Sequence, residues 1–307
     1  MRKEIGMGGT SPLVSVVIPT YERADRLPRA VESVLSQTYS NIEVLVVNDN
    51  EPDSAFDIET ERVLASFEDE RLRVLHTVGR TGGGAARNYC CENARGEYLA
   101  FLDDDDEYEP DKIETQLSFM LQNDLDMSWQ DVAWYDEGGE LVERRQLDHA
   151  EGYDQESLLR AHLKIPISPT SIYMLKRKVF EKTDGFGEVA TGQDWWLMLR
   201  CIESGARIGY MPGVHVRQYL HAGKRLSLGN NKIRGEEERH RVVQGYYDRL
   251  SREEIRFIEF RHNAVLAISS IRSHSLISAL GYLAKALAIS PVDFLAEGKR
   301  YLIKAKK

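Results

Sequence analysis

Four consecutive aspartates, Asp103 to Asp106, directly follow the apolar segment 98–102 and are the residues best placed to do chemistry. A short apolar run with polar residues on both sides predicts a buried strand of a parallel sheet, and open α/β sheets bind ligands beyond the carboxyl ends of their strands. Side chains alternate along an extended backbone, so Asp103 and Asp105 would point to the same side. Together they could hold a cation.

The chemistry of this cluster favours a metal ion over a solvated acidic turn, which is the usual interpretation of an acidic run. Several carboxylates this close ionise together only when positive charge lies among them. Their hard oxygen ligands suit Mg²⁺ or Mn²⁺, and no cysteine or histidine is near them in the sequence to favour zinc. The buried strand directly upstream therefore indicates a site for a metal and a diphosphate.

The elements that would position this site alternate between strand and helix over the first hundred residues. The apolar spacing i, i+3, i+4, i+7 predicts a helix, and short apolar runs predict strands. The predicted strands cover residues 14–18, 42–47, 72–75 and 98–102, with helices at 27–35, 54–67 and 82–94. This alternation is typical of βαβ units in a doubly wound parallel sheet, whose strand ends share one edge.

Three other polar segments would lie at that edge with the aspartates, namely 20–23, Asp49 and 81–87. The glycines of 81–87 precede a helix, where free backbone N–H groups favour phosphate, although three glycines are also typical of a tight turn. The loop matches neither the P-loop nor the dinucleotide-binding pattern. Asp49 taken alone is typical of a turn or a helix cap.

Asp194 lies at the predicted start of a helix, next to Trp195 and Trp196. It is either an N-cap residue or a general base, since a carboxylate beside two indole rings is partly desolvated and accepts a proton more readily. The helix N-terminus acts in the opposite direction by stabilising the charged form. His215 and His221 flank another predicted strand, and a histidine near a metal could complete its coordination.

The second half of the chain is less regular. The sequence predicts a helix at 110–121, a hairpin of strands at 126–135 and 140–145, a strand at 171–175 and a helix at 194–202. From about Gly229 onward only long helices are predicted, and we place a domain boundary there. A chain of 307 residues has room for one large α/β domain and a smaller helical part.

The composition argues against several classes of protein. A net charge of −9 and a pI near 5.5 exclude a nucleic-acid partner, since phosphate binding requires a basic face. The three cysteines, two of them adjacent, form no disulfide framework and suit a reducing compartment. No secretory signal and no apolar stretch of about 18 residues is present, so we expect a cytoplasmic protein.

Taken together, the motifs resemble a family 2 glycosyltransferase with the GT-A fold, an α/β fold in which a doubly wound, mostly parallel sheet binds the nucleotide. Five segments carry the resemblance in the order of the family: VVIPTYER at 16–23, EVLVVND at 43–49, GGGAARN at 82–88, FLDDDD at 101–106 and QDWW at 193–196. The resemblance covers about 12–228, which implies a short tail at 1–11, a catalytic domain at 12–228 and a C-terminal helical region at 229–307.

The resemblance implies a nucleotide-diphosphate sugar donor, most often a UDP-sugar, and Mn²⁺ or Mg²⁺ as the cofactor. Asp103 and Asp105 would hold the metal, with His221 as a candidate further ligand, and Asp194 would deprotonate the acceptor hydroxyl. The implied donor contacts are Pro19, Thr20, Tyr21, Glu22, Asp49, Gly83, Arg87, Asp103 and Asp104. The transfer would invert the anomeric configuration and serve cell-surface polysaccharide or glycoconjugate synthesis, with a glycan or lipid-linked acceptor.

Two departures from the family pattern bear on specificity. Asn48 and Asn50 flank Asp49 where Asp and Gly are usual, which affects the choice of nucleobase, and Gln193 replaces a common Glu, which affects the acceptor. The motif of processive synthases is absent, so we expect transfer of single sugars. The alternatives are a metal-dependent nucleotidyltransferase, for which 18–23 lacks the basic glycine-rich loop, and a non-catalytic sugar-nucleotide-binding module.

The C-terminal region combines helical spacing at 236–261, an apolar helix at 276–287 and basic residues near its end. A helical cap packed on the catalytic domain is the simpler interpretation. Peripheral attachment to an anionic membrane surface is the other, since an amphipathic helix and a basic segment act together there.

Overall fold

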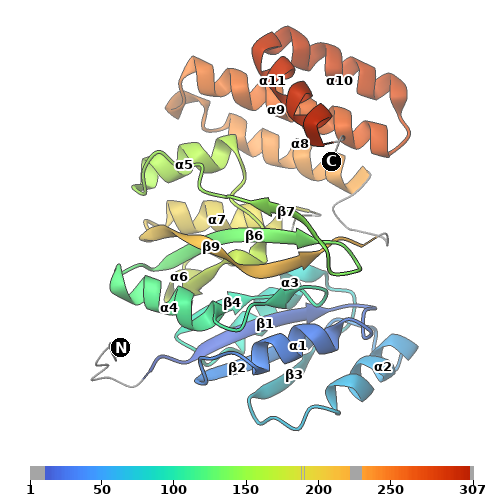
Figure 1. Cartoon of the computed structure of the whole chain (residues 1–307), viewed down its shortest axis with the longest axis vertical. Coiled ribbons are helices and arrows are strands. Elements are labelled where there is room, and N and C mark those ends of the chain that lie inside the picture. The colour runs from blue at the N-terminus through green and yellow to red at the C-terminus, as the bar shows by residue number, and fades with distance from the viewer. Residues whose placement is uncertain (1–10, 188, 190, 222–229, 305–307) are drawn as a thin grey trace. The chain divides into compact units, whose positions relative to one another are not determined.

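The computed structural model describes residues 11–187, 189, 191–221 and 230–304 (Figure 1). They fall into two compact units, one of residues 11–158, 167–187 and 193–221 and the other of residues 159–166, 189, 191–192 and 230–304. The predicted tail lies outside the described residues except for Ser11, and so does the predicted boundary between residues 228 and 229. The domain bounds therefore stay a prediction.

The first unit is built on a mixed sheet with the strand order β3-β2-β1-β4-β8-β6-β9-β5, to which β7 is added beside β6. Strands β3, β2, β1 and β4 are parallel, as are β6 and β9, whereas β5, β7 and β8 pair antiparallel with their neighbours. In chain order the strands are β1 Val14–Thr20, β2 Ile42–Asn48, β3 Leu72–His76, β4 Tyr98–Phe101, β5 Glu107–Tyr108, β6 Met127–Tyr135, β7 Leu141–Arg145, β8 Met174–Lys176 and β9 Ile208–Tyr219. The predicted parallel strands and the predicted hairpin are confirmed.

The helices form where the sequence provides an apolar stripe or a cap. The stripe of α1 buries Leu27, Ala30, Val31 and Val34, and the Ser54 hydroxyl caps α2 by accepting a hydrogen bond from a backbone N–H of its first turn. The α-helices before residue 222 are α1 Leu27–Leu35, α2 Ala55–Leu64, α3 Gly83–Glu92, α4 Lys112–Gln122, α5 Gln155–Lys164, α6 Arg177–Phe180 and α7 Gln193–Glu203. The predicted helices that correspond to α1, α2, α3, α4 and α7 are confirmed. Helices α5 and α6 are not predicted from the sequence.

Three strands differ from the sequence prediction. The strand expected between His215 and His221 is β9, which begins at Ile208, so His215 lies within this strand. The predicted strand at 171–175 is a 3₁₀ turn, η1 Thr170–Ile172, followed by β8. The backbone N–H of Tyr173 donates to the carbonyl oxygen of Thr170 at 3.0 Å and closes this turn, so the extended conformation of the strand begins only at Met174. The two residues of β5 are too few to show a periodic pattern, and this strand has no signal in the sequence.

The register of the parallel strands places the polar segments together. Thr20 ends β1 beside Asn48, the last residue of β2, and Phe101 ends β4 beside Val17 of β1. All residues of β2 and β4 are buried. Asp49 and the aspartate run, which follow these two strands, therefore emerge at the same edge of the sheet.

The described residues of the second unit beyond position 229 are helical, as predicted. They form α8 Asn230–Gln244, the short 3₁₀ helix η2 Tyr247–Arg249, α9 Arg252–Arg272, α10 Leu276–Ile289 and α11 Pro291–Lys304 (Figure 1). Among the described residues no single helix has both the length and the apolar composition needed to cross a membrane. Helix α10 and the part of α11 up to Lys299 meet both criteria only as a pair, and a bend of 118° separates them.

Two histidines join α8 to α9. The rings of His240 and His262 stack with their centroids 3.7 Å apart, and each ring faces a carboxylate of the other helix. His240 Nε2 lies 3.3 Å from Glu259 Oε1, and His262 Nδ1 lies 3.2 Å from Glu236 Oε1. Burial raises the pKa of Glu236, but the hydrogen bond with His262 and the charge of Arg239 outweigh it and lower that pKa to about 2.

Glu236→Gln is expected to lower the free energy of unfolding by about 3 kcal/mol near neutral pH, because the folded state holds the carboxylate at a pKa far below its unfolded value. A depressed folded pKa contributes stability above the unfolded pKa of 4.5, and this contribution is lost as the pH falls through about 2. The difference between variant and wild type should thus shrink to about half by pH 3. Urea unfolding at both pH values measures it.

The neighbouring exposed residue provides the control for this prediction. Glu237→Gln removes the same charge from the same turn of α8 at an exposed position, where a substitution typically changes stability by less than about 0.5 kcal/mol. An equal loss in both variants, or a loss in Glu236→Gln that stays constant with pH, would show that the ion pairs between α8 and α9 do not stabilise the unit.

Candidate functional site

The four aspartates form a turn between β4 and β5. The backbone N–H of Leu102 donates to the carbonyl oxygen of Val17 at 3.0 Å, and the N–H of Asp106 donates to that of Asp103 at 3.1 Å, which closes the turn. Carboxylate oxygens of Asp103, Asp105 and Asp106 all lie within 4.8 Å of one another. The pair expected to share a cation is thus brought together, and the structure adds Asp106, to which the sequence assigns no role.

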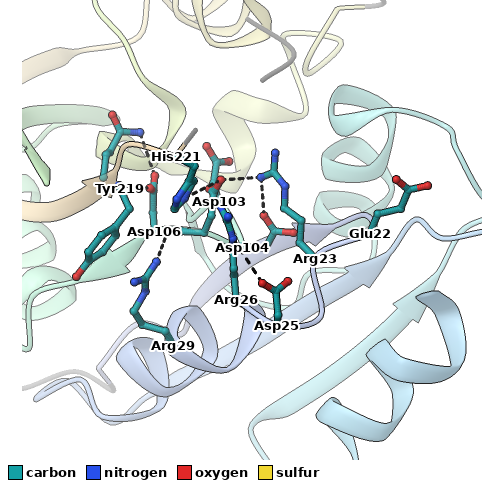
Figure 2. Close-up of polar contacts among 12 residues, drawn as sticks. Glu22, Arg23, Asp25, Arg26, Arg29, Asp103, Asp104, Asp106, Tyr219 and His221 are labelled. Atoms are coloured by element: carbon teal, nitrogen blue, oxygen red, sulfur yellow. Dashed lines mark hydrogen bonds and ion pairs between the residues drawn. The ribbon is translucent and has the colours of Figure 1, made fainter. Parts of the chain in front are cut away.

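Two arginines from the segment around the start of α1 hold the run. Arg23 Nη1 donates to Asp104 Oδ1 at 3.1 Å and to Asp105 Oδ2 at 2.7 Å. Arg29 Nη2 donates to the backbone oxygen of Asp105 at 2.6 Å, and its guanidinium lies 3.6 Å from the ring centroid of Tyr219. Figure 2 shows Arg23 and Arg29 on opposite sides of the aspartates. The turn is therefore fixed before any ligand arrives.

The buried members of the run carry an unfavourable concentration of negative charge. Burial raises the pKa of Asp104 to about 7, although Arg23 opposes this shift. Burial and the charges of Asp103 and Asp105 raise the pKa of Asp106 well above its ordinary value, even though Gln218 Nε2 and the Tyr219 N–H donate to it at 3.0 and 3.1 Å. A divalent cation would relieve this repulsion, so the donor set fits Mg²⁺ or Mn²⁺.

His221 lies beside the run, whereas His215 does not. His221 Nε2 is 3.5 Å from Asp105 Oδ2, and its side chain is 9% exposed. Figure 2 shows the imidazole among the aspartate side chains. His215 instead contacts Asp111, with Nδ1 2.9 Å from Oδ1. Of the two candidate histidines, only His221 is close enough to the acidic run to join its metal.

Arg87 connects the run to two helix starts. Its guanidinium donates to Asp103, to the Gly83 carbonyl oxygen at 3.1 Å and to Gln193 Oε1 at 3.2 Å. Gly83 is the first residue of α3 and Gln193 the first of α7. One side chain thus ties the glycine loop, the aspartate run and the residue before Asp194 into one site.

Asp194 lies in the first turn of α7 rather than at its N-cap. Its Oδ1 accepts a hydrogen bond from the backbone N–H of Trp195 at 2.9 Å, and the Tyr173 hydroxyl donates to its carbonyl oxygen at 3.4 Å. Trp195 is buried and Trp196 half-buried. Arg87 contacts both Gln193 and Asp103. Because Asp194 directly follows Gln193, the first turn of α7 lies close to Asp103.

Asp49 organises the glycine loop. Its carboxylate accepts four hydrogen bonds, from the Thr77 hydroxyl, from the N–H and hydroxyl of Thr81 and from the Gly82 N–H, at 2.6 to 2.9 Å. Gly82 has a φ of +91° and leads directly into α3, and a glycine adopts this conformation without strain. The donor contact assigned to Asp49 from the resemblance stays a prediction beside this structural role.

Asp49→Asn is expected to lower the free energy of unfolding by about 2–3 kcal/mol. The amide NH₂ group would face part-buried N–H and hydroxyl donors, and at least one of these donors would lose its acceptor. Chemical denaturation measures the loss. Asp53→Asn is the matched control, because Asp53 is exposed on the same segment and its φ of +62° suits asparagine equally well. Equal stability of the two variants would contradict the role given to Asp49.

Comparison with known proteins identifies the family of this chain. The family model for glycosyl transferase family 2 matches residues 15–184, which is over half of the chain. The chain belongs to this family. All five motif segments except the one at 193–196 lie within the matched residues.

The relatives and solved structures similar to this family 2 chain agree with that result. The putative teichuronic acid biosynthesis glycosyltransferase TuaG of Bacillus subtilis is 38% identical over 125 residues, which are 40% of this chain and 48% of TuaG. The chain spans between 18 and 51% of the length of the first curated relatives it matches.

Two solved structures share the fold of the family 2 chain. S. aureus TarS 1–349 in complex with UDP-GlcNAc has a TM-score of 0.61 at 14% identity, covering 90% of this chain and 91% of that one. The mannosyltransferase PcManGT from Pyrobaculum calidifontis in complex with GDP-Man and Mn²⁺ has a TM-score of 0.59 at 19% identity, covering 96% and 81%. The GT-A fold expected from the sequence is thereby confirmed.

Proposed function

We propose that the chain transfers a single sugar from a nucleotide-diphosphate sugar, in the first instance a UDP-sugar, to a hydroxyl group of a glycan or lipid-linked acceptor. The observation that carries this proposal is the position of Arg87, which contacts Asp103 of the acidic run and Gln193 next to Asp194. Groups suited to a metal-bound diphosphate and a carboxylate suited to proton transfer therefore belong to one site.

The similar proteins support the substrate class. TarS is described in complex with UDP-GlcNAc, PcManGT with GDP-Man and Mn²⁺, and TuaG by its part in teichuronic acid biosynthesis. We propose accordingly that this chain acts in the synthesis of cell-surface polysaccharide or glycoconjugate. Its three cysteines are free and buried, which suits a reducing compartment on the cytoplasmic side.

The proposed donor site follows the strand ends. Thr20 and Asp49 lie where β1 and β2 end side by side, and the backbone N–H of Asp49 donates to the Thr20 carbonyl oxygen at 3.0 Å. We assign the nucleobase and ribose to this edge, which also carries Pro19, Tyr21 and Glu22, and we assign the diphosphate to Gly83 and Arg87 at the start of α3. Asp104 is the proposed ribose contact, and through its ion pair it also keeps Arg23 beside Asp105.

The proposed metal ligands are Asp103, Asp105 and Asp106, with His221 next to Asp105. A divalent cation bound by these residues would supply the positive charge that stabilises the departing nucleoside diphosphate. Hard carboxylate oxygens suit Mn²⁺ or Mg²⁺.

Asp194 performs the proton transfer. Its carboxylate takes the proton of the acceptor hydroxyl while that oxygen forms a bond to the anomeric carbon. The bond between this carbon and the diphosphate oxygen breaks on the opposite face, and its electron pair leaves with the diphosphate. One such displacement inverts the anomeric configuration. Asp194 lies in the first turn of α7, where the helix dipole favours negative charge.

The two alternatives differ in what they predict. Family membership decides against a nucleotidyltransferase. A non-catalytic sugar-nucleotide-binding module would bind a donor without turning it over, so turnover is the deciding measurement. Release of nucleoside diphosphate should be assayed from UDP-, GDP- and dTDP-linked sugars with Mn²⁺, both alone and with a panel of glycan and lipid-linked acceptors. We expect one nucleotide class to be consumed faster when acceptor is present, and binding without any release would contradict the proposal.

A further inference from the structure

Helix α10 exposes one apolar face. Leu276, Ile277 and Leu280 are 65, 89 and 67% exposed, and Leu287, two turns further on, is 45% exposed. These positions follow the spacing i, i+1, i+4 and i+11, so they lie along one side of the helix. The exposed apolar side chains continue beyond the bend in α11, where Val292 and Leu295 are 77 and 63% exposed.

The opposite face of α10 is apolar as well. Ala279 and Ala286 are buried there, and Lys285 is the one charged residue of the helix. A helix that is apolar all round is normally enclosed by protein or lipid, and a row of exposed leucine and isoleucine side chains marks a surface at which something binds. The small buried alanines account for only one face of α10, so its outer face requires a partner.

The charge of this region indicates which partner. Residues 273–307 carry six basic and two acidic side chains, whereas the whole chain has a net charge of −9. The basic residues are Lys285, Lys299, Arg300, Lys304, Lys306 and Lys307. A second copy of this chain would bring the same excess of positive charge and be repelled. An anionic surface would be attracted, and exposed apolar side chains together with clustered basic residues are the combination that binds acidic lipids.

We propose that the outer face of α10 and the adjoining α11 form a membrane-docking surface that rests on an anionic phospholipid bilayer. The side chains of Ile277 and Leu280 enter the boundary between headgroups and acyl chains, and the exposed side chains of Lys285 and Lys299 reach the lipid phosphates. The helices lie in the plane of the membrane and do not cross it. This inference rests on the helical unit alone and holds whichever sugar nucleotide the first unit uses.

Flotation of the full chain with vesicles tests the proposal. With vesicles of phosphatidylcholine and phosphatidylglycerol in equal parts, wild-type protein should float, and with pure phosphatidylcholine its bound fraction should fall strongly, as it should at raised salt. The double variant Ile277→Ser with Leu280→Ser should lower the partition coefficient about tenfold or more. Lys285→Glu with Lys299→Glu should weaken binding to the anionic vesicles only.

The matched control removes equally apolar exposed residues elsewhere. Ile58→Ser with Val142→Ser changes side chains that are 62 and 54% exposed in the first unit, and it should float like wild type. All substituted side chains are exposed, so circular dichroism should show each variant folded. Equal flotation of the two double variants, or no flotation of wild type, overturns the proposal.

Two further outcomes would also overturn it. If light scattering finds a dimer that Ile277→Ser with Leu280→Ser dissociates, and no vesicles are bound, the occupant is a second copy of the chain. If alkaline carbonate fails to release the bound protein, the helices insert into the membrane instead of lying on it. Donor turnover in solution is measured separately, so failure of membrane docking and failure of the proposed transferase activity are distinguishable.

Discussion

Asp194→Asn is expected to lower the turnover number for sugar transfer about a thousandfold while the dissociation constant of the donor changes by less than about twofold. Asparagine keeps the shape of the side chain and can still accept the hydrogen bond from the Trp195 N–H, so the start of α7 should keep its structure. It cannot take the proton of the acceptor hydroxyl. Steady-state transfer and calorimetric donor binding together measure the two quantities.

The control for this variant is Glu203→Gln at the far end of the same helix. It removes one carboxylate from α7 outside the proposed site, and its turnover number should match that of wild type. If Asp194→Asn kept more than about a tenth of the activity, the base would have to be another group, and the role assigned here to α7 would be wrong.

Asp105→Asn is the second change with a large expected effect. It removes one of three clustered carboxylate groups, and the affinity for Mn²⁺ and kcat/KM for the donor should each fall by about a hundredfold or more. Arg23 retains its contact with Asp104, so the turn should stay folded. Mn²⁺ titration followed by electron paramagnetic resonance, alongside transfer assays at increasing Mn²⁺ concentration, measures both effects.

Asp25→Asn serves as the comparison for Asp105→Asn. Its side chain is 77% exposed and lies 3.7 Å from Arg26, outside the cluster, although Figure 2 shows it in the same region. We expect its Mn²⁺ affinity to equal that of wild type. A similar loss in both variants would show a diffuse effect of negative charge, not coordination by the acidic run.

The first half of the fold could be predicted because its signals are local. Short stretches of sequence are enough to predict the apolar stripe of α1, the buried strands β2 and β4 and the serine cap of α2. Where the signal is weak, prediction fails: β5 has two residues, and η1 shortens the strand expected at 171–175. Helix α5 is not predicted although its sequence carries a signal: Asp154 caps its start by accepting a hydrogen bond from the Ser157 N–H, and Leu158, Leu159 and Leu163 are buried.

Only the site residues that directly follow strand ends could be brought together from the sequence. Asp103, Asp105 and Asp49 could be placed at one edge because parallel strands end together. The contacts of Arg87 with Gln193, 106 residues apart in sequence, and of Arg29 with Asp105 depend on tertiary packing and have no local signal. For the same reason the sequence could not show that the carboxylate of Asp49 accepts four hydrogen bonds from the 77–82 loop.

The metal-dependent binding of a nucleotide at the acidic run is the central claim, and isothermal titration of UDP and GDP tests it most directly. Wild-type protein should bind one of the two at least about tenfold more tightly with Mn²⁺ than with a chelator, and Asp105→Asn should abolish that difference. Equal affinity with and without Mn²⁺, unchanged in Asp105→Asn, would contradict the account.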